Sequence, residues 1–285
     1  MKEKLKVKDM MGYDVVLNFP PKKIVSLVPS QSELLWHLGL SDKLVGITKF
    51  CIHPADMKIK VEKIGGTKKL NINKIISLKP DLIIGNKEEN EKSDITELKK
   101  HFPVWMSDIE NLKDALKMIE EIGKITGKEK KSIEIISKIQ SEKLKFSKKT
   151  EENSTSCVYF IWRNPYMVAG KNNFINSMLK VCGLKNVFDS RKFNKNSFEN
   201  KNVRYPQINE DLLSTVEPNL ILLSSEPYPF KEKHITELKT ICPSALVKIV
   251  DGEMFSWYGS RLINSFKYFN SLLAEKEIKE LNGKS

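Results

Sequence analysis

The side chains that could do chemistry in this sequence gather directly after apolar segments that are typical of β-strands. They occur in five stretches: Thr48–His53, Asn86–Asn90, Trp162–Met167, Arg204–Tyr205 and Asp251–Tyr258. Their aromatic rings could stack on a flat ligand, and their charged groups could pair with polar groups at its edge. The pattern therefore predicts recognition of a large, partly flat molecule with a polar edge.

We expect these stretches to line a cleft, because the carboxyl ends of parallel strands form the ligand crevice of α/β proteins. The expected ligand-binding residues, each aromatic, charged or a flexible thioether, are Phe50, Lys87, Glu88, Trp162, Arg163, Tyr166, Met167, Arg204, Tyr205, Glu253, Phe255, Trp257, Tyr258 and Arg261.

Known catalytic signatures are absent from the sequence. It contains no G-x-S-x-G, no complete phosphate-binding loop, no G-x-G-x-x-G and no H-E-x-x-H. Cys51 and His53 could supply two metal ligands from one loop, but a buried thiol beside a loop imidazole explains the same pair. We therefore expect a binding protein and leave direct metal binding open.

Composition indicates a globular chain long enough for two domains. The 285 residues are 40% hydrophobic, and the net charge of +12 comes from scattered lysines that alternate with glutamates. This pattern does not favour nucleic-acid binding, and we expect a monomer. The amino-terminal segment lacks an apolar run typical of a signal peptide, so the sequence as it stands predicts a cytoplasmic protein, or a periplasmic one if a leader was removed.

Strand and helix patterns alternate along the first half of the chain. A hairpin is expected over Asp9–Leu17 and a buried strand over Lys23–Val28. Ser30 and Glu33 have the spacing of a capping box that would open the next helix, and Glu88–His101 has helical character. This order predicts a parallel sheet covered by helices.

A long helix without Pro or Gly is expected over Lys128–Lys149, where apolar residues spread over half of the helical wheel. A polar linker and a second β/α series follow it. We therefore predict an amino-terminal α/β lobe over residues 1–127, a connecting helix over 128–149 and a carboxyl-terminal α/β lobe over 150–285.

An internal repeat supports two similar lobes. The segments starting at Asn71 and Asn209 align without gaps at a constant offset. Each begins with an asparagine helix cap and continues to a proline, Pro80 or Pro218, followed by an apolar strand. Matched caps and prolines favour duplication of one lobe over chance similarity.

These blocks, together with KIVSLVPSQSELLWHLGL, YMVAGKNNFINSMLKVCGLKNVF and GSRLINSFKYFNSL, resemble periplasmic substrate-binding proteins for cobalamin and iron–siderophore complexes, most closely the cobalamin branch. The resemblance covers nearly the whole chain. It implies two Rossmann-like lobes joined by one rigid helix, a ligand held between them for an ABC importer, no catalysis and no intrinsic cofactor. The implied ligand is a corrinoid or an iron complex.

The resemblance also assigns positions. It matches ligand-facing aromatic positions to Phe50, Tyr205 and the Trp162–Met167 loop, and an acidic and aromatic loop to the residues Glu253, Phe255 and Trp257. Two other aromatic positions of the cobalamin branch hold Thr67 and Asn86 here. Together with Arg163, Arg204, Arg261 and Lys87, this departure indicates an anionic ligand such as a ferric chelate or another tetrapyrrole.

Permease docking in the family uses one acidic residue on each lobe. The matching positions are Asn73 and Asp211, so Asp211 alone is the expected docking acid. A second hypothesis therefore stays open, in which a cytoplasmic enzyme or cofactor-handling protein reuses the fold, with His53, Glu88, Glu89 and Glu253 as its reactive set. A single connecting helix would also permit only a small closure of the lobes.

Overall fold

The computed structural model describes residues 3–147, 155–190, 192–198 and 200–282. The chain forms two compact α/β units. Unit 1 comprises Met1–Ile109, Lys113–Gln140 and Trp257–Ile263, and unit 2 comprises Glu110–Leu112, Ser141–Ser256 and Asn264–Ser285. The polar linker expected after the long helix, residues 150–156, lies largely outside the described residues.

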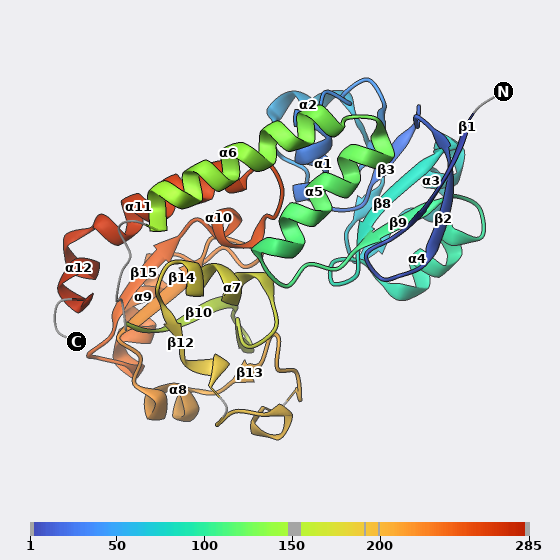
Figure 1. Ribbon diagram of the computed structural model, residues 1–285. Helices are drawn as coiled ribbons and strands as arrows, with labels where there is room; N and C mark the ends of the chain where they lie inside the picture. Colours follow the sequence, from blue (N-terminus) through green and yellow to red (C-terminus); the bar gives the residue numbers. More distant parts are fainter. Residues whose placement is uncertain (1–2, 148–154, 191, 199, 283–285) are drawn as a thin grey trace. The chain divides into compact units, whose positions relative to one another are not determined.

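Unit 1 is built on a five-stranded parallel sheet with the strand order β5-β4-β3-β8-β9 (Figure 1). The central strands are fully buried, as expected for a parallel sheet covered on both faces. Its strands are β3 (Ile24–Ser26), β4 (Leu44–Ile47), β5 (Glu62–Lys63), β8 (Leu82–Asn86) and β9 (Val104–Ser107).

Helices follow the strands of unit 1 in the predicted alternation. They are α1 (Pro29–His37), α2 (Ala55–Lys60), α3 (Ile72–Leu78), α4 (Lys92–Lys99) and α5 (Leu112–Thr126). Two antiparallel ribbons complete the unit, β1 (Glu3–Lys8) with β2 (Asp14–Phe19), and β6 (Gly65–Gly66) with β7 (Lys69–Leu70). The hairpin predicted around Gly12 is confirmed, and Gly12 takes a positive φ of 88° at its turn.

Unit 2 has a six-stranded mixed sheet in which β10 (Ser156–Trp162), β14 (Leu220–Ser224) and β15 (Leu246–Val250) run parallel. Short strands pair on the other side of β10. They are β11 (Tyr166–Val168), β12 (Lys185–Asn186) and β13 (Gln207–Ile208).

The helices of unit 2 follow its strands and enclose a core that includes Phe160, Phe188 and Leu238. They are α7 (Phe174–Val181), α8 (Glu210–Val216), α9 (Glu232–Ile241), α10 (Gly252–Ser256), α11 (Leu262–Ala274) and α12 (Lys276–Asn282), with the 3-10 turns Val187–Asp189 and Lys195–Ser197. Each unit therefore has its own sheet and its own apolar core.

The long helix α6 spans Glu129–Ser147 and is unbroken, as its sequence predicted. Its residues up to Gln140 belong to unit 1, and those from Ser141 onward belong to unit 2. The units differ from the expected lobes at two segments, because Glu110–Leu112 belongs to unit 2 and Trp257–Ile263 belongs to unit 1. The expected lobe over residues 150–285 is therefore not continuous.

The repeated segments have the same backbone conformation. Asn71 and Asn209 cap α3 and α8, accepting hydrogen bonds from Lys74 N at 3.0 Å and Leu212 N at 2.9 Å. Both helices end at a left-handed residue, Lys79 with φ 49° and Glu217 with φ 40°. The strands β8 and β14 begin three residues later in each repeat.

The capping box predicted at Ser30 is wrong. Helix α1 begins at Pro29, a residue preorganised for the first helical position, and its cap residue Val28 makes no side-chain cap bond. The Glu33 carboxylate instead accepts hydrogen bonds from Arg261, which lies 228 residues later in the chain. The helix expected over Glu88–His101 is shorter, because the first of these residues form a turn after β8.

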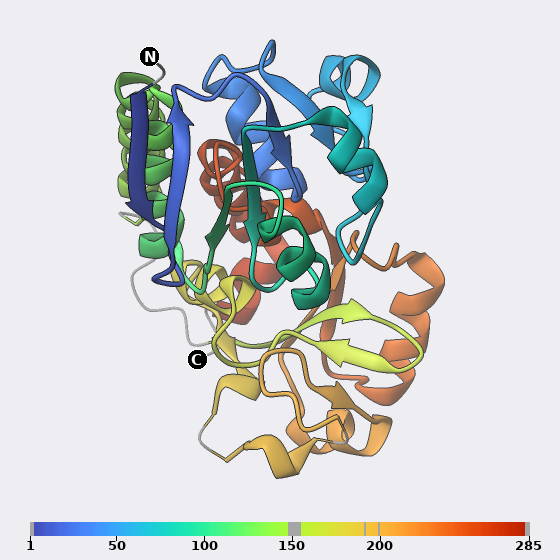
Figure 2. The same cartoon turned by 90° about the vertical axis from the view of Figure 1, so that its right-hand side faces the viewer.

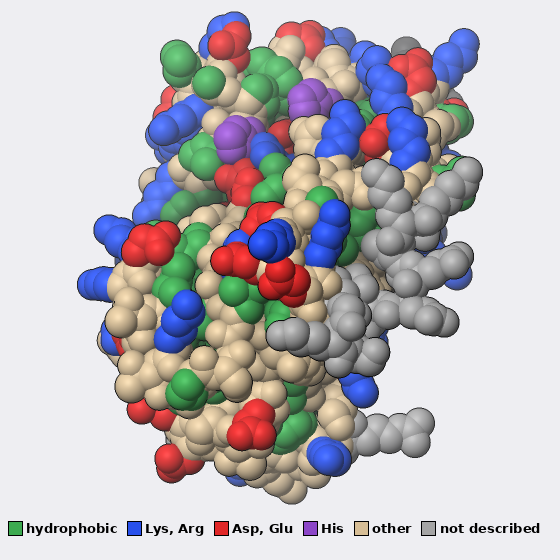
Figure 3. All heavy atoms as spheres, turned by 90° about the vertical axis from the view of Figure 1, so that its left-hand side faces the viewer, with side chains coloured by type: hydrophobic (Ala, Val, Ile, Leu, Met, Phe, Trp, Pro, Cys, Tyr) green, Lys and Arg blue, Asp and Glu red, His purple; other side chains and the backbone are tan. Residues whose placement is uncertain are grey.

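No helix of the described residues is long and apolar enough to cross a membrane. On the face drawn in Figure 3, Lys and Arg side chains are interspersed with Asp and Glu rather than gathered in a block of one sign. On this face the positive charge is thus spread among negative groups, in line with the alternation of lysine and glutamate in the sequence.

Candidate functional site

Phe50 is a large exposed aromatic residue that follows strand β4 in unit 1, and its side chain is 50% exposed. Lys49 Nζ lies 5.1 Å from its ring centroid. Gly66 lies close to this ring, since a Cβ at position 66 would be only 3.2 Å from a ring carbon of Phe50. A glycine at this position therefore leaves room for the ring. The exposed face of this ring is therefore a stacking surface at the carboxyl edge of the sheet.

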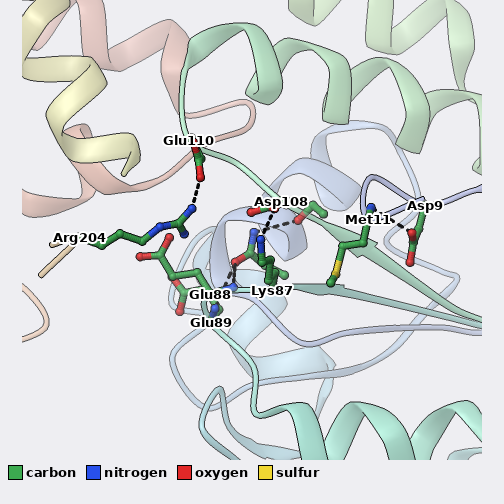
Figure 4. Close-up of polar contacts among 10 residues, drawn as sticks. Asp9, Met11, Lys87, Glu88, Glu89, Asp108, Glu110 and Arg204 are labelled. Atoms are coloured by element: carbon green, nitrogen blue, oxygen red, sulfur yellow. Dashed lines mark hydrogen bonds and ion pairs between the residues drawn. The ribbon is translucent and has the colours of Figure 1, made fainter. Parts of the chain in front are cut away.

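A charged turn follows β8 at the same edge of the sheet (Figure 4). The Asn86 side chain accepts hydrogen bonds from the backbone of Glu88 at 2.8 Å and of Glu89 at 3.1 Å. Lys87 Nζ lies 2.6 Å from Asp108, the residue after β9. Lys87 is thus already paired with a carboxylate, and the turn adds two further carboxylates.

Asn86 itself has a structural role. Its side chain is buried and donates to Ser107 Oγ at 3.0 Å, which also receives a hydrogen bond from Gln31 at 2.6 Å. An aromatic residue at this position would lose these bonds. Asn86 therefore holds the turn after β8 against the end of β9.

The segment Trp257–Ile263 brings three expected ligand-binding residues, Trp257, Tyr258 and Arg261, into unit 1, where all three are buried. Gly259 permits the close approach, since it has a φ of 142° and a Cβ there would lie 3.0 Å from Ser30 O.

Arg261 forms a two-pronged ion pair with Glu33, at 3.0 Å from Nε and 2.8 Å from Nη2. Its guanidinium also stacks on Trp257, 4.7 Å from the ring centroid. Less than a tenth of either charged side chain is exposed. The charge of Arg261 is therefore already compensated by a carboxylate of unit 1, and its contact with an anionic ligand stays a prediction.

In unit 2, Trp162 ends strand β10 at the tip of the β10–β11 hairpin, which is the yellow-green hairpin of Figure 2. Its side chain is 40% exposed. Tyr228, from the loop after β14, packs edge-on against it with ring centroids 5.7 Å apart. The pair forms an aromatic surface at the carboxyl edge of the parallel strands.

Arg163 and Tyr166 of the same hairpin converge on Glu237 of helix α9. Arg163 donates to both carboxylate oxygens of Glu237, at distances from 2.8 to 3.1 Å, and the Tyr166 hydroxyl also donates to Glu237. Burial alone would raise the pKa of Glu237, but the hydrogen bonds from Arg163 and Tyr166 lower it. Glu237 is therefore ionised and holds the Arg163 guanidinium.

Arg204, which precedes β13, is also paired, with Glu110 of the same unit (Figure 4). Its neighbour Tyr205 is half-buried and accepts a hydrogen bond from Asn200 through its backbone oxygen at 3.0 Å. Met167 is half-buried and pairs with Gln207 of β13. All three arginines expected at the site thus form ion pairs within their own units.

Phe255 is a core residue of unit 2 and has no exposed surface. It packs on Phe269 at 4.7 Å and on Tyr159 at 5.2 Å between ring centroids. Its expected ligand contact is therefore corrected. Glu253 precedes it in the first turn of α10 and is half-buried, with its backbone N–H bonded to Asp251 at 3.1 Å.

Cys51 and His53 do not converge on a common point. The Cys51 thiol is buried against Ser32 at 3.2 Å and Thr48 at 3.3 Å, and burial raises its pKa. The His53 ring instead packs edge-on against Trp257 with centroids 5.9 Å apart. The described residues contain no group of three or more His, Cys, Asp or Glu that could hold a metal ion.

Asp211 and Asn73 occupy equivalent places in the first turns of α8 and α3, and both are exposed.

Five partners of the expected site residues were not predicted from the sequence. They are Glu33, Asp108, Glu110, Tyr228 and Glu237. Tyr228 could have been found, because it follows the apolar segment Leu220–Ser224 as the other candidates follow theirs. Nothing in the local sequence marks the three glutamates as partners of arginines.

Comparison with known proteins places the chain among binding proteins. The profile of a family described as "Periplasmic binding protein" matches residues 24–240. An uncharacterized ABC transporter substrate-binding lipoprotein, YvrC of Bacillus subtilis, is 37% identical over 193 residues, which are 63% of this chain and 60% of that protein's length. A vitamin B12-binding protein of Vibrio campbellii is 24% identical over 73% of this chain and 72% of its own length.

Solved structures with the same fold include the periplasmic vitamin B12 binding protein BtuF of Vibrio cholerae. It has a TM-score of 0.73 and 20% identity, over 92% of this chain and 98% of that one. A periplasmic heme binding protein from Pseudomonas aeruginosa has a TM-score of 0.73 and 17% identity, over 88% and 92%. At these identities the likeness concerns the fold alone.

Proposed function

Because the chain belongs to the periplasmic binding protein family, we propose that it is a substrate-binding protein that delivers a metal-centred complex to an ABC importer. The candidate ligands are a corrinoid, another tetrapyrrole and a ferric siderophore. Vitamin B12-binding proteins are among its relatives, and heme-binding and possible iron-binding proteins are among the solved structures with the same fold, while the ferric siderophore comes from the resemblance stated above. The complex is cargo in this proposal, and the protein performs no chemistry on it.

The observation that carries the proposal is the matched pair of exposed aromatic residues. Phe50 lies at the carboxyl edge of the sheet of unit 1, and Trp162 lies at that of unit 2. Large apolar side chains are usually buried, so exposed rings at the ligand-binding edge of two α/β units favour stacking on a flat ligand. Tyr228 extends the surface beside Trp162.

Spectroscopic titration of the purified protein with cyanocobalamin, hemin and a ferric siderophore tests the proposal. We expect saturable binding of at least one of them, with quenching of tryptophan fluorescence. Phe50→Ala and Trp162→Ala should each weaken that binding about five- to thirty-fold, which corresponds to about 1–2 kcal/mol of lost stacking. No saturable binding of any of the three would contradict the proposal.

Matched controls are available in each unit. Ile59 in unit 1 and Leu144 in unit 2 are exposed apolar residues, 82% and 62% exposed, that lie on helices away from strand ends. Ile59→Ala and Leu144→Ala should leave the affinity within about two-fold of the wild type. An equal loss in these variants would point to a general loss of structure instead of a stacking role.

We also propose that the protein works outside the cytoplasmic membrane and is a monomer.

We further propose that Asp211 contacts the permease. Asp211 is exposed on the first turn of α8, where a positively charged partner could reach it. The expected result is weaker capture of Asp211→Asn by the permease in detergent, with unchanged ligand affinity. Equal capture of the variant and the wild type would overturn the assignment.

A further inference from the structure

Arg163 follows Trp162 directly in the hairpin and is the arginine adjacent in sequence to the aromatic surface of unit 2. Its Nε lies 2.9 Å and 3.1 Å from the two oxygens of Glu237, and Nη2 lies 2.8 Å from one of them. Slightly more than a quarter of each side chain is exposed. A ligand can therefore reach the pair, but it meets a guanidinium whose charge is already compensated.

The Glu237 carboxylate also accepts a hydrogen bond from a second residue of the hairpin, Tyr166. The hydroxyl of Tyr166 donates to the same carboxylate, and the Tyr166 ring packs edge-on against the buried Phe160 at 5.4 Å. A ligand carboxylate that took Glu237's place on Arg163 would leave the partly buried Glu237 carboxylate without its guanidinium and would put the Tyr166–Glu237 hydrogen bond at risk. Displacement of Glu237 by an anionic ligand is thus unfavourable.

His234, one turn before Glu237, does not add a positive charge. Its Nδ1 accepts the backbone N–H of Lys231 at 2.8 Å, so the ring proton is on Nε2, which lies 3.4 Å from the Tyr228 hydroxyl. Burial, with the charges of Arg163 and Lys233, lowers the pKa of His234. The imidazole beside the aromatic surface is therefore neutral.

The remaining charges at the strand ends of unit 2 are mostly negative. Glu226 follows β14, and Asp251 and Glu253 follow β15. In unit 1 the corresponding turn pairs Lys87 with Asp108 and adds Glu88 and Glu89. Unit 2, taken by itself, thus presents aromatic rings among carboxylates, without an uncompensated arginine at its described strand ends, whereas in unit 1 Lys49 lies beside the Phe50 ring.

We propose that Glu237 is a specificity-determining residue that makes the site discriminate against ligands with carboxylate edges. By neutralising Arg163 beside the Trp162–Tyr228 surface, it favours uncharged, amide-edged metal complexes such as corrinoids. This inference rests on the proposed function, and it reverses the expectation of an anionic ligand that the arginines suggested in the sequence.

Paired titrations with cyanocobalamin, whose corrin ring carries amide side chains and no free carboxylate, and hemin, which carries two carboxylates, test the inference. The wild type should prefer cyanocobalamin. Glu237→Gln removes the negative charge and retains an acceptor for Arg163 and Tyr166. It should improve hemin binding about ten-fold, a change equivalent to about 1.4 kcal/mol, and leave cyanocobalamin binding within about two-fold.

Two further variants test whether the effect comes from the negative charge of Glu237 or from a change in the structure around it. Glu237→Asp retains the charge and should retain the preference for cyanocobalamin. Glu232→Gln removes a negative charge from the first turn of the same helix, and it should leave both affinities unchanged. Thermal unfolding of each variant should confirm that the fold is retained.

The possible outcomes distinguish the inference from the proposed function. Binding of a metal complex by the wild type with a hemin preference, or an unchanged ratio in Glu237→Gln, would overturn the role of Glu237 alone. No binding of cyanocobalamin, hemin or a ferric siderophore by the wild type would overturn the proposed function and, with it, the inference.

Discussion

The buried ion pair between Glu33 and Arg261 should be sensitive to the loss of either partner. Both side chains are less than a tenth exposed, so Glu33→Ala would leave a guanidinium in a buried site without its carboxylate. We expect Glu33→Ala or Arg261→Met to reduce the free energy of unfolding by about 3–5 kcal/mol, measured by urea denaturation.

The double variant Glu33→Met with Arg261→Met is the matching control. It removes both charges and fills the site with apolar side chains, so we expect it to be more stable than either single variant. A double variant as unstable as the sum of the single ones would contradict a direct energetic coupling between the two residues.

Protonation of His234 should destabilise unit 2. Burial and neighbouring positive charges lower its pKa in the folded state, so its neutral form is favoured there. Its contribution to stability is therefore complete above the ordinary histidine pKa of about 6.5 and is lost as pH falls from that value through the lower folded-state pKa. Urea midpoints measured from pH 8 to pH 5 should show this loss.

His234→Asn is the control for this titration, because its amide oxygen can still accept the Lys231 N–H but does not titrate in this range. We expect the variant to lose less stability than the wild type between pH 8 and pH 5. Parallel curves for the two proteins would assign the acid sensitivity to other groups.

At the level of single residues, the sequence predicted which side chains matter better than it predicted what they contact. Trp162 and Phe50 are exposed where the strand-end argument expected them. The partners of Arg163 and Arg261 lie 74 and 228 residues away in the chain, so no local pattern could reveal them. The spacing of Ser30 and Glu33 fits a capping box, so the local pattern predicts that Glu33 caps the helix. In the structure the Glu33 carboxylate instead forms a stronger, charge-assisted bond with the distant Arg261 guanidinium.

At the level of elements, the repeat provides a matched pair of substitutions. Lys79 and Glu217 end α3 and α8 in the left-handed region, which a Cβ disfavours. Lys79→Gly and Glu217→Gly should each raise the free energy of unfolding by about 0.5–1 kcal/mol. Urea denaturation of both variants checks the prediction.

Substitution inside the same helix gives the opposite expectation. Lys74→Gly, in the interior of α3, should lower stability by about 1 kcal/mol because glycine is a poor helix former. If glycine at position 79 or 217 destabilised as much as glycine at position 74, the left-handed ends of the two repeats would have no strain to relieve.

Most elements could be predicted because their signals are local. The asparagine caps, the prolines after α3 and α8, and the unbroken apolar strands each lie within a few residues of the structure they specify. The start of α1 was predicted less well, since Pro29 and the Ser30–Glu33 spacing gave competing signals. Very short strands such as β12 and β13 depend on their neighbours and carry no pattern of their own.

For the whole molecule, we predict a small conformational change on ligand binding. Helix α6 crosses from unit 1 to unit 2 without Pro or Gly, and sharp helix bends occur mainly at such residues. The radius of gyration in solution scattering should change by less than about 1 Å when ligand is added. A clear compaction at saturating ligand would contradict this expectation.

The division of the molecule was predictable only in outline. Composition, length and the repeat indicated two α/β bodies, and the long helix marked the passage between them. The return of Trp257–Ile263 to unit 1 depends on Gly259 and on the Arg261–Glu33 contact. These are tertiary effects, which a linear reading of the chain does not contain.

This returning segment has a consequence for biosynthesis. A ribosome produces the sheet of unit 1 first, yet Glu33 receives its partner only when Arg261, 228 residues later, has been added. Unit 1 is therefore completed only after the sheet of unit 2 has been translated. A nascent chain halted after α6 would carry an unfinished first unit, and synthesis through Trp257–Ile263 would supply the contact that finishes it.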